Sequence, residues 1–222
     1  GPKITEEFLI HAPDQILELY AVEDWLNDNK ILLKQMNASA AFAIATADLE
    51  KISSRSTPNQ VLAIVRKKKD QQEITVPPGV FLMLDGIQDP GNFGTIVRIA
   101  DWFGISAILC SPECADLYNP KVVQSTMGSL LRVNVIYTNL ADWCKINTGA
   151  EIYAATLHGK SIYQCAPLTH GAILMGNESK GVQPELLQLC KEQITIPRTG
   201  LAESLNAAVA TGIILSHLVK QV

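Results

Sequence analysis

Long apolar runs are missing from this 222-residue sequence, and its start lacks the charged, apolar and small-residue sections of a signal peptide. The first absence excludes a membrane-spanning helix, which needs about 20 consecutive apolar residues. Aromatic residues are also few, at 6%, although 47% of the residues are apolar. The composition therefore predicts a globular protein with a mainly aliphatic core.

Cysteine is scarce and scattered, with five residues of which only Cys110 and Cys114 lie close together. No second pair completes the spacing of a zinc site, and the four histidines do not cluster with the cysteines. Scattered cysteines without a disulfide pattern are typical of proteins from reducing compartments. We therefore expect reduced thiols, a cytoplasmic location and no metal ion.

An excess of positive charge is absent as well, because 22 acidic residues outnumber 18 basic ones and the net charge is −4. This balance argues mildly against nucleic acid as a ligand, since phosphate binding normally leaves a basic footprint. The one basic run is Arg66-Lys67-Lys68-Lys69. A solvated domain edge and an edge that contacts phosphate are both consistent with this run.

A polar segment with two prolines divides the sequence into two parts. Residues 71–79 form a linker that ends in Pro77-Pro78-Gly79, where the adjacent prolines bar a helix. We therefore expect a first domain over residues 1–70 and a second domain over residues 80–222.

The first domain contains patterns for both helices and strands. Apolar residues at helical spacing predict an amphipathic helix over residues 4–20, broken near Pro13. A short helix is expected over residues 48–52, and the apolar run at residues 61–65 predicts a buried strand.

In the second domain, short apolar runs alternate with helical patterns. Such alternation predicts an α/β fold with a mostly parallel sheet covered on both faces. The last helical pattern is apolar nearly all round, which favours a subunit interface over a solvated helix, with core packing as the alternative. The predicted strands are 80–84, 107–110, 133–137, 152–155, 172–175 and 194–196, and the predicted helices are 92–103, 120–131, 140–145, 184–190 and 203–219.

Three polar motifs follow apolar strands, at the positions where open α/β sheets bind ligands. The first motif, residues 85–94, leads into a helix that carries Arg98 between apolar neighbours. Its glycines allow close backbone approach and the helix N-terminus favours an anion, while Arg98 needs an acidic or phosphate partner. On spacing alone, a turn with a structural ion pair is the simpler interpretation.

The second and third motifs lie near the end of the sequence. Gly176-Asn177-Glu178 ends a strand, and its carboxylate can orient a hydroxyl, neutralise an arginine or cap a helix. The third motif runs from Ile196-Pro197-Arg198 to Glu203-Ser204-Leu205-Asn206. Ser204 has the ordinary role of an N-cap. Asn206, expected inside an apolar helix, has poor helix propensity and needs hydrogen-bond partners if it is buried.

In this order and with these intervals, the three motifs resemble those of the SpoU family of RNA ribose 2′-O-methyltransferases, within the SPOUT superfamily. The resemblance covers roughly residues 80–222, and more weakly the first 70 residues. It implies a small N-terminal α/β substrate-binding domain and a C-terminal, mostly parallel-sheet SPOUT domain with a deep trefoil knot. It also implies S-adenosyl-L-methionine as the cofactor, ribosomal or transfer RNA as the substrate, and a homodimer.

The resemblance also implies roles for individual residues. Arg98 would hold the phosphate beside the target ribose and orient its hydroxyl, because a guanidinium essentially never deprotonates and is a poor base. The other implied roles are catalytic positioning by Asn92, Glu178, Ser204 and Asn206, cofactor contacts by Leu157, Gly176, Asn177, Ile196 and Leu205, and RNA contacts by Arg66, Lys67, Lys68, Arg98 and Arg198.

The sequence departs from the family pattern at Arg198, where an apolar residue is common, and at Ala207-Ala208, where Val-Ser is common. Neither departure removes a catalytic candidate. Gly1-Pro2-Lys3 resembles the middle of a family segment that follows a basic stretch, which implies a basic N-terminal arm before this sequence. Gly1-Pro2 by itself also fits the scar of a protease cleavage.

Two further functions are compatible with parts of the sequence. The acidic balance supports a catalytically silent RNA-binding protein, although an intact set of Arg98, Glu178, Ser204 and Asn206 argues against it. A glycine loop between a strand and a helix suggests a nucleotide-binding oxidoreductase. That function is excluded by the lack of an acidic residue closing a second strand at the required distance.

Overall fold

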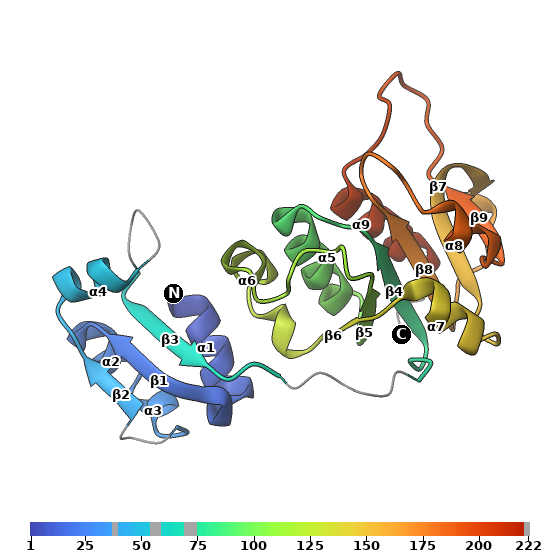
Figure 1. Cartoon of the computed structure of the whole chain (residues 1–222). Coiled ribbons are helices and arrows are strands. Elements are labelled where there is room, and N and C mark those ends of the chain that lie inside the picture. The colour runs from blue at the N-terminus through green and yellow to red at the C-terminus, as the bar shows by residue number, and fades with distance from the viewer. Residues whose placement is uncertain (37–39, 54–58, 69–74, 220–222) are drawn as a thin grey trace. The chain divides into compact units, whose positions relative to one another are not determined.

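The computed structural model describes residues 1–36, 40–53, 59–68 and 75–219. The chain forms two compact units, Gly1–Asp70 and Gln71–Val222 (Figure 1). The first four residues of the predicted linker and Lys69 of the basic run lie outside the described residues.

The first unit is built on a three-stranded sheet. Its central strand, β1 (Ile16–Ala21), pairs in parallel with β2 (Ala41–Ala43) and antiparallel with β3 (Val61–Val65). The strand predicted over residues 61–65 is therefore confirmed. The helices of this unit are α1 (Pro2–His11), η1 (Pro13–Gln15), α2 (Glu23–Asp28), α3 (Lys30–Leu33) and α4 (Thr46–Ile52).

The helix predicted over residues 4–20 is wrong in its second half. Helix α1 ends at His11, and after the turn η1 the chain forms β1. Proline has no N–H and clashes with the preceding turn, so a helix cannot continue smoothly through Pro13. In β1, Leu19 and Ala21 are fully buried while Tyr20 between them is half-buried, which is the alternation of a strand.

The second unit has a six-stranded sheet in the order β6-β5-β4-β8-β7-β9, and all its neighbouring strands are parallel. No helix among the described residues is long and apolar enough to cross a membrane. The elements are β4 (Val80–Asp85), α5 (Pro90–Trp102), β5 (Ala107–Cys110), α6 (Pro120–Thr126), η3 (Ser129–Leu131), β6 (Asn134–Tyr137), α7 (Leu140–Ile146), β7 (Ile152–Ser161), η4 (Ile162–Gln164), β8 (Gly171–Gly176), α8 (Pro184–Gln188), β9 (Glu192–Thr195) and α9 (Ala207–Leu218).

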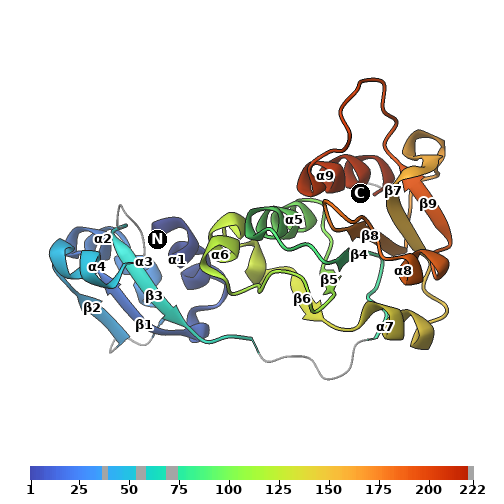
Figure 2. The same cartoon turned by 45° about the horizontal axis from the view of Figure 1, so that its top comes forward.

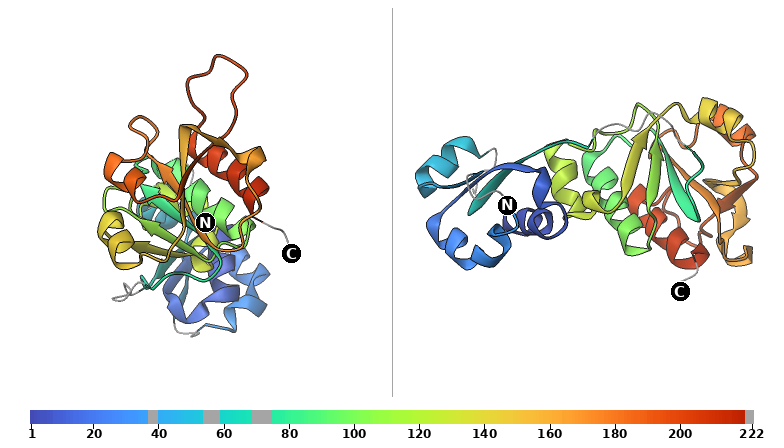
Figure 3. Two further views of the ribbon diagram at one scale, coloured as in Figure 1. Left: turned by 90° about the vertical axis from the view of Figure 1, so that its right-hand side faces the viewer. Right: turned by 90° about the horizontal axis from the view of Figure 1, so that it is seen from below.

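Helices cover both faces of this sheet, with α5 and α9 on one side and α7 and α8 on the other (Figure 2, Figure 3). Strand β4 lies in the middle, and its residues 81–84 are completely buried. Phe81 packs edge to face on Trp143 of α7, with 5.8 Å between the ring centroids. The predicted α/β class with a mostly parallel sheet is confirmed.

Two predicted elements have different bounds for identifiable reasons. The helix predicted over 120–131 is interrupted after Thr126, because Met127 and Gly128 take positive φ values of 52° and 97°. The strand predicted over 152–155 continues as β7 to Ser161, and its pairing with β9 shifts register between Ala155 and Lys160.

Helices α5 and α6 come close together at Gly94, the glycine of the first motif. A Cβ atom at this position would lie 2.6 Å from both Ser125 Cβ and the Val122 carbonyl oxygen. Real Cβ atoms essentially never approach other atoms so closely. The glycine is therefore required by helix packing, independently of any ligand.

Replacing Gly94 with alanine should lower the free energy of unfolding by about 1–3 kcal/mol, because the added methyl group overpacks the interface. Gly212→Ala is the matched control in α9, where a Cβ atom would meet only Ile99 Cδ1 at 3.7 Å. It should be neutral or stabilising by up to about 1 kcal/mol. Urea unfolding at one protein concentration measures both, and equal stabilities would contradict the packing role.

Candidate active site at the ends of strands β4 and β8

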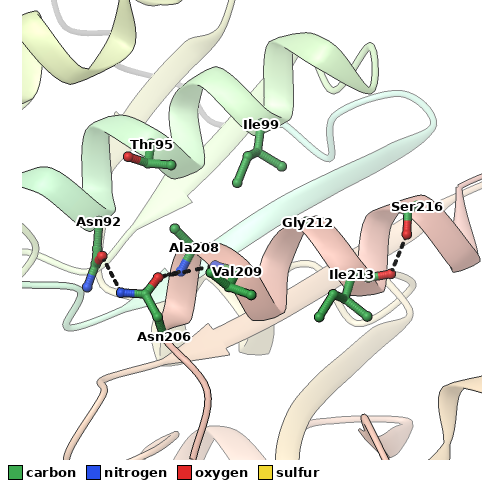
Figure 4. A pocket seen from close by; sticks show the side chains of 9 residues that line it. All are labelled: Asn92, Thr95, Ile99, Asn206, Ala208, Val209, Gly212, Ile213 and Ser216. Atoms are coloured by element: carbon green, nitrogen blue, oxygen red, sulfur yellow. Dashed lines mark hydrogen bonds between the residues drawn. The ribbon is translucent and has the colours of Figure 1, made fainter.

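A chain of side-chain hydrogen bonds joins the three motifs. The Asn92 amide nitrogen donates to Glu178 Oε1 at 2.8 Å. The Asn92 amide oxygen in turn accepts from the Asn206 amide nitrogen at 2.8 Å (Figure 4). Residues from three distant parts of the sequence thus meet where the parallel strands β4 and β8 end, as expected for a site in an open α/β sheet.

Asn206 also forms the N-cap of α9. Its side-chain oxygen accepts from the backbone N–H groups of Ala208 at 3.0 Å and Val209 at 3.2 Å. The predicted helix start at residue 203 and the predicted cap at Ser204 are therefore wrong. Ser204 lies exposed in the loop before the helix, and Asn206 is the cap instead of an interior residue. Its poor interior propensity is thereby explained, since asparagine is among the best N-caps.

The loop after β4 is held by residues of the second motif. The Asn177 side chain donates to the Gly86 carbonyl at 2.7 Å and accepts from the N–H groups of Ser179 and Lys180. Gly86 has a φ of +67°, which favours glycine. Asn177 is thus placed to shape two loops at once.

Asp85 is a structural residue that the sequence pattern did not single out. This carboxylate, 1% exposed, accepts from the Gln183 backbone N–H and side-chain amide, both at 2.7 Å. The two bonds tie the end of β4 to the segment before α8. The sequence did contain a signal for this role, because an aspartate directly follows a run of apolar strand residues. A carboxylate buried at such a position requires hydrogen-bond partners.

Thiols and a phenol support the loop behind the first motif. Cys114 donates to the Leu84 carbonyl, and Tyr137 donates to the Ala115 carbonyl at 2.6 Å. Burial raises the pKa of the Cys110 thiol, whereas a hydrogen bond from Cys110 lowers the pKa of Cys114. Burial also raises the pKa of Tyr137. All five cysteines are unpaired, as the sequence predicted.

Arg98 lies exposed on α5, the helix that also carries Asn92. Among the described residues no carboxylate pairs with it, although Arg132 pairs with Asp101 at 2.9 Å and Lys121 with Asp89 at 3.7 Å. The structural ion pair considered from the sequence is therefore not found in the described part of the chain. The Arg98 guanidinium remains available to an anion.

A cavity of about 360 Å³ opens beside Asn92 and Asn206, between α5 and α9 (Figure 4). Its walls are mainly apolar, and Val209 is 52% exposed. The lining residues are Asn92, Thr95, Ile99, Asn206, Ala208, Val209, Gly212, Ile213 and Ser216.

The residues predicted to contact a cofactor lie in or directly after β7, β8 and β9, or directly before α9. The pairing of Ala154 with Leu174 brings the part of β7 after Ala154 level with the end of β8, where Gly176 lies. Thr195 donates to the Leu157 carbonyl at 3.3 Å, which brings Leu157 beside the residues that follow β9. Leu157 is 64% exposed. The remaining predicted cofactor residues are Asn177, Ile196 and Leu205, of which Leu205 is exposed directly before the cap.

The predicted RNA contacts fall in different parts of the chain. Arg198 is exposed, and its guanidinium donates to the Ala202 carbonyl at 3.0 Å within the loop between β9 and α9. Arg66, Lys67 and Lys68 follow β3 in the first unit. In the described ranges, no group of three or more His, Cys, Asp or Glu side chains is arranged to hold a metal ion.

The Asn92–Asn206 bond should contribute measurably to stability. Asn206→Asp keeps the capping oxygen but removes the donor to Asn92. The loss in unfolding free energy that it causes should therefore be smaller in a protein that already carries Asn92→Ala. We expect a coupling free energy of about 0.5–1.5 kcal/mol in this double-mutant cycle, measured by urea unfolding. Strictly additive costs would show that the bond has no energetic weight.

Comparison with known proteins identifies the family. The SpoU rRNA methylase family model matches residues 79–216. The chain is 33% identical over 171 residues to 23S rRNA (guanosine(2553)-2'-O)-methyltransferase RlmP of Bacillus subtilis, covering 75% of this chain and 67% of that protein. It is 28% identical over 237 residues to 23S rRNA (guanosine-2'-O-)-methyltransferase RlmB of Escherichia coli, covering 100% and 97%.

The fold agrees with that assignment. The structure of an AdoMet-bound rRNA methyltransferase from Sinorhizobium meliloti superimposes with a TM-score of 0.81 at 26% identity, covering 96% of this chain and 84% of that one. The chain therefore belongs to the SpoU rRNA methylase family, as its three motifs predicted.

Proposed function

We propose that this protein transfers the methyl group of S-adenosyl-L-methionine to a ribose 2′-hydroxyl of ribosomal or transfer RNA. The observation that carries this proposal is the hydrogen-bonded chain Glu178–Asn92–Asn206, whose central residue lies on the same helix as the exposed Arg98. Family membership and the named activities of RlmP and RlmB support the same reaction. A catalytically silent RNA-binding protein is the less supported alternative, because the relatives RlmP and RlmB are both named as methyltransferases.

The residues at the strand ends suit the cofactor. Backbone groups of Gly176, Ile196 and Leu205 would hold it, and the exposed Leu157 and Leu205 side chains would cover its apolar surface. The AdoMet-bound relative from Sinorhizobium meliloti supports this assignment. When bound, S-adenosyl-L-methionine would supply an electrophilic methyl group on a sulfonium, and the Glu178 carboxylate would favour binding of that positive charge.

Arg98 is assigned the main role in binding and orienting the substrate. A ribose hydroxyl is a poor nucleophile until its proton is removed or strongly polarised. Because a guanidinium does not give up its proton, we assign Arg98 to the phosphate beside the target ribose, where its planar fork fixes the sugar. Glu178, Asn92 and Asn206 hold the surrounding loops, and Ser204 supplies a further hydroxyl near them. Orientation and electrostatics then provide most of the rate.

A trefoil knot is part of this proposal. Strand β9 is at the outer edge of the sheet, beyond β7, yet α9 packs on β8, on η4 and on α5. The segment from β9 to α9 therefore has to return past the loops that follow β7 and β8. We expect the knot to form by threading of this segment through those loops. Asn206 would fix the position at which the chain enters α9.

A homodimer is proposed across the cavity between α5 and α9. Val209 and the neighbouring Ile99 and Ile213 leave apolar surface open on a helix pair that is otherwise well packed. A second copy would cover this surface and place its own site beside the first. Because α9 starts at Asn206, the interface would be continuous with the active site.

The two units would divide the work. We assign residues 1–70 to binding of the RNA substrate, with Arg66, Lys67 and Lys68 as phosphate contacts, residues 71–79 to the linker and residues 80–222 to methyl transfer. Arg198 would contact RNA or the rim of the cofactor. A cytoplasmic location, expected from the unpaired cysteines, belongs to the same proposal.

Isothermal titration with S-adenosyl-L-methionine and S-adenosylhomocysteine tests the cofactor, and mapping of ribose methylation in RNA from a deletion strain then identifies the substrate. Arg98→Ala should bind the cofactor normally but turn over about 100-fold or more slowly, since it removes one oriented charge from the transition state. Lys145→Ala on α7 is the matched control and should retain full activity. Near-wild-type turnover of Arg98→Ala would refute the role of this arginine.

Val209→Glu should convert a dimer into monomers, because it buries an unpaired charge in the proposed interface. Ile146→Glu, at an exposed apolar position on α7, should leave the assembly unchanged. Light scattering after size-exclusion chromatography measures both masses. A dimer that survives Val209→Glu would locate the subunit contact elsewhere.

A further inference from the structure

On one face of the three-stranded sheet in the first unit, the described side chains are half-buried or exposed. Along β1, Leu19 and Ala21 point to the buried face, so Glu18 and Tyr20 lie on the opposite one. The register places Leu62 and Ile64 of β3 beside Tyr20 and Glu18, respectively. The strand pairing therefore places all four side chains on the same face of the sheet, which we call the open face.

An aromatic pair stands on this open face. Phe42 of β2 pairs in register with Tyr20, and their rings stack with centroids 5.3 Å apart and planes inclined by 22°. Phe42 is 42% exposed and belongs to the edge strand of the sheet, so nothing on the described sheet covers its outer side. Tyr20 is fixed by its hydroxyl, which donates to Glu18 Oε2 at 2.7 Å.

A positive charge follows on the same face. The Arg66 backbone N–H donates to the Gln15 carbonyl at 2.7 Å, which continues the β1–β3 ladder by one step. Side chains two apart in a strand share a face, so Arg66 lies on the face of Leu62 and Ile64. At roughly 3.3 Å per residue, Arg66 is about 13 Å along the strand from Leu62. Lys67 and Lys68 extend the basic character beyond it.

We propose that this face binds unpaired nucleotides of the RNA substrate, with bases stacked on Phe42 and Tyr20 and phosphates held at Arg66. The inference rests on the proposed function in that the ligand is RNA. Stacking on exposed aromatic rings is how proteins hold single-stranded nucleic acid, because every base has a π-face. The Glu18 carboxylate repels phosphate from the middle of the face, so bases lie there and the backbone runs on the Arg66 side.

Single-stranded RNA is favoured over two other occupants. A duplex presents stacked bases that cannot reach the aromatic pair, and its grooves offer mainly backbone and hydroxyl groups. A second copy of this sheet face would bury Arg66 and Glu18 of both copies against apolar side chains, and removing these charges from water is costly even when they pair. A positive charge next to exposed aromatic rings matches the phosphates and unstacked bases of single-stranded RNA.

The test uses the full chain and a labelled, unstructured RNA of 12 nucleotides in fluorescence anisotropy. Phe42→Ala and Phe42→Leu should both bind about tenfold more weakly, because each removes a stacking ring. Phe42→Trp should restore binding. Ile31→Ala, which trims an exposed apolar residue on α3, is the matched control and should bind like the wild type.

The role of Arg66 has a separate readout. If it holds one phosphate of a single strand, Arg66→Ala should lower the slope of log K against log salt concentration by about 0.7. An unchanged slope would remove this residue from the binding face.

Several results would overturn the inference. These are wild-type affinity of both Phe42→Ala and Phe42→Leu, equal affinity for a duplex of the same length, or no binding of the single strand. Altered oligomeric state of Phe42→Ala with unchanged RNA binding would assign the face to a second copy instead. Titration of S-adenosyl-L-methionine and a methylation assay on the same proteins keep the two proposals apart. The protein could fail to bind the cofactor or to methylate RNA while its Phe42 variants still bind RNA more weakly. That result would support the RNA-binding face and refute the proposed methyltransferase function.

Discussion

The amide of Asn92 is the contact on which the arrangement of the site depends. It donates to Glu178 and accepts from Asn206, so a single side chain joins the loops after β4 and β8 to the start of α9. A neutral amide does both without introducing charge. A carboxylate at this position would repel Glu178, and a cationic side chain has no acceptor for Asn206. Since Asn206 also caps α9, the helix axis and the loops are fixed together.

Arg98 contrasts with this network although it lies on the same helix. The amide chain is satisfied within the protein, whereas the exposed guanidinium has no carboxylate partner among the described residues. A charge held on a rigid helix and left without a partner is well suited to an anionic ligand, because little reorganisation is needed when it binds. In the proposed function, the site combines fixed loops with this charge, and the first unit would add a surface for the rest of the RNA.

The sequence predicted the second unit well because its strands are continuous apolar runs, a pattern that parallel sheets require. It failed at Ile16–Tyr20, where short apolar runs fit both the helical and the strand period. The motifs correctly indicated which residues gather, but not their bonds: Glu178 lies 86 residues from Asn92, and Asn206 lies 114 residues from it. The tie between Asp85 and Gln183 was likewise beyond local patterns, since it joins loops of two separate strands. The cap at Asn206 was missed because Ser204 fits the same signal.

The two motif glycines show why these motifs alone do not separate an enzyme from a silent relative. A Cβ atom on Gly94 would collide with α6, and one on Gly176 would overlap the backbone of Gly181 and Val182. Asn92, Glu178 and Asn206 also form bonds that hold the fold. A chain without activity could keep these residues for their structural contacts alone. Arg98 has no such structural contact in the described part of the chain, and an exposed cation contributes little to folding. Arg98 is therefore the motif residue for which the proposed function gives a reason and the fold gives none, so its substitution is the test that separates the two.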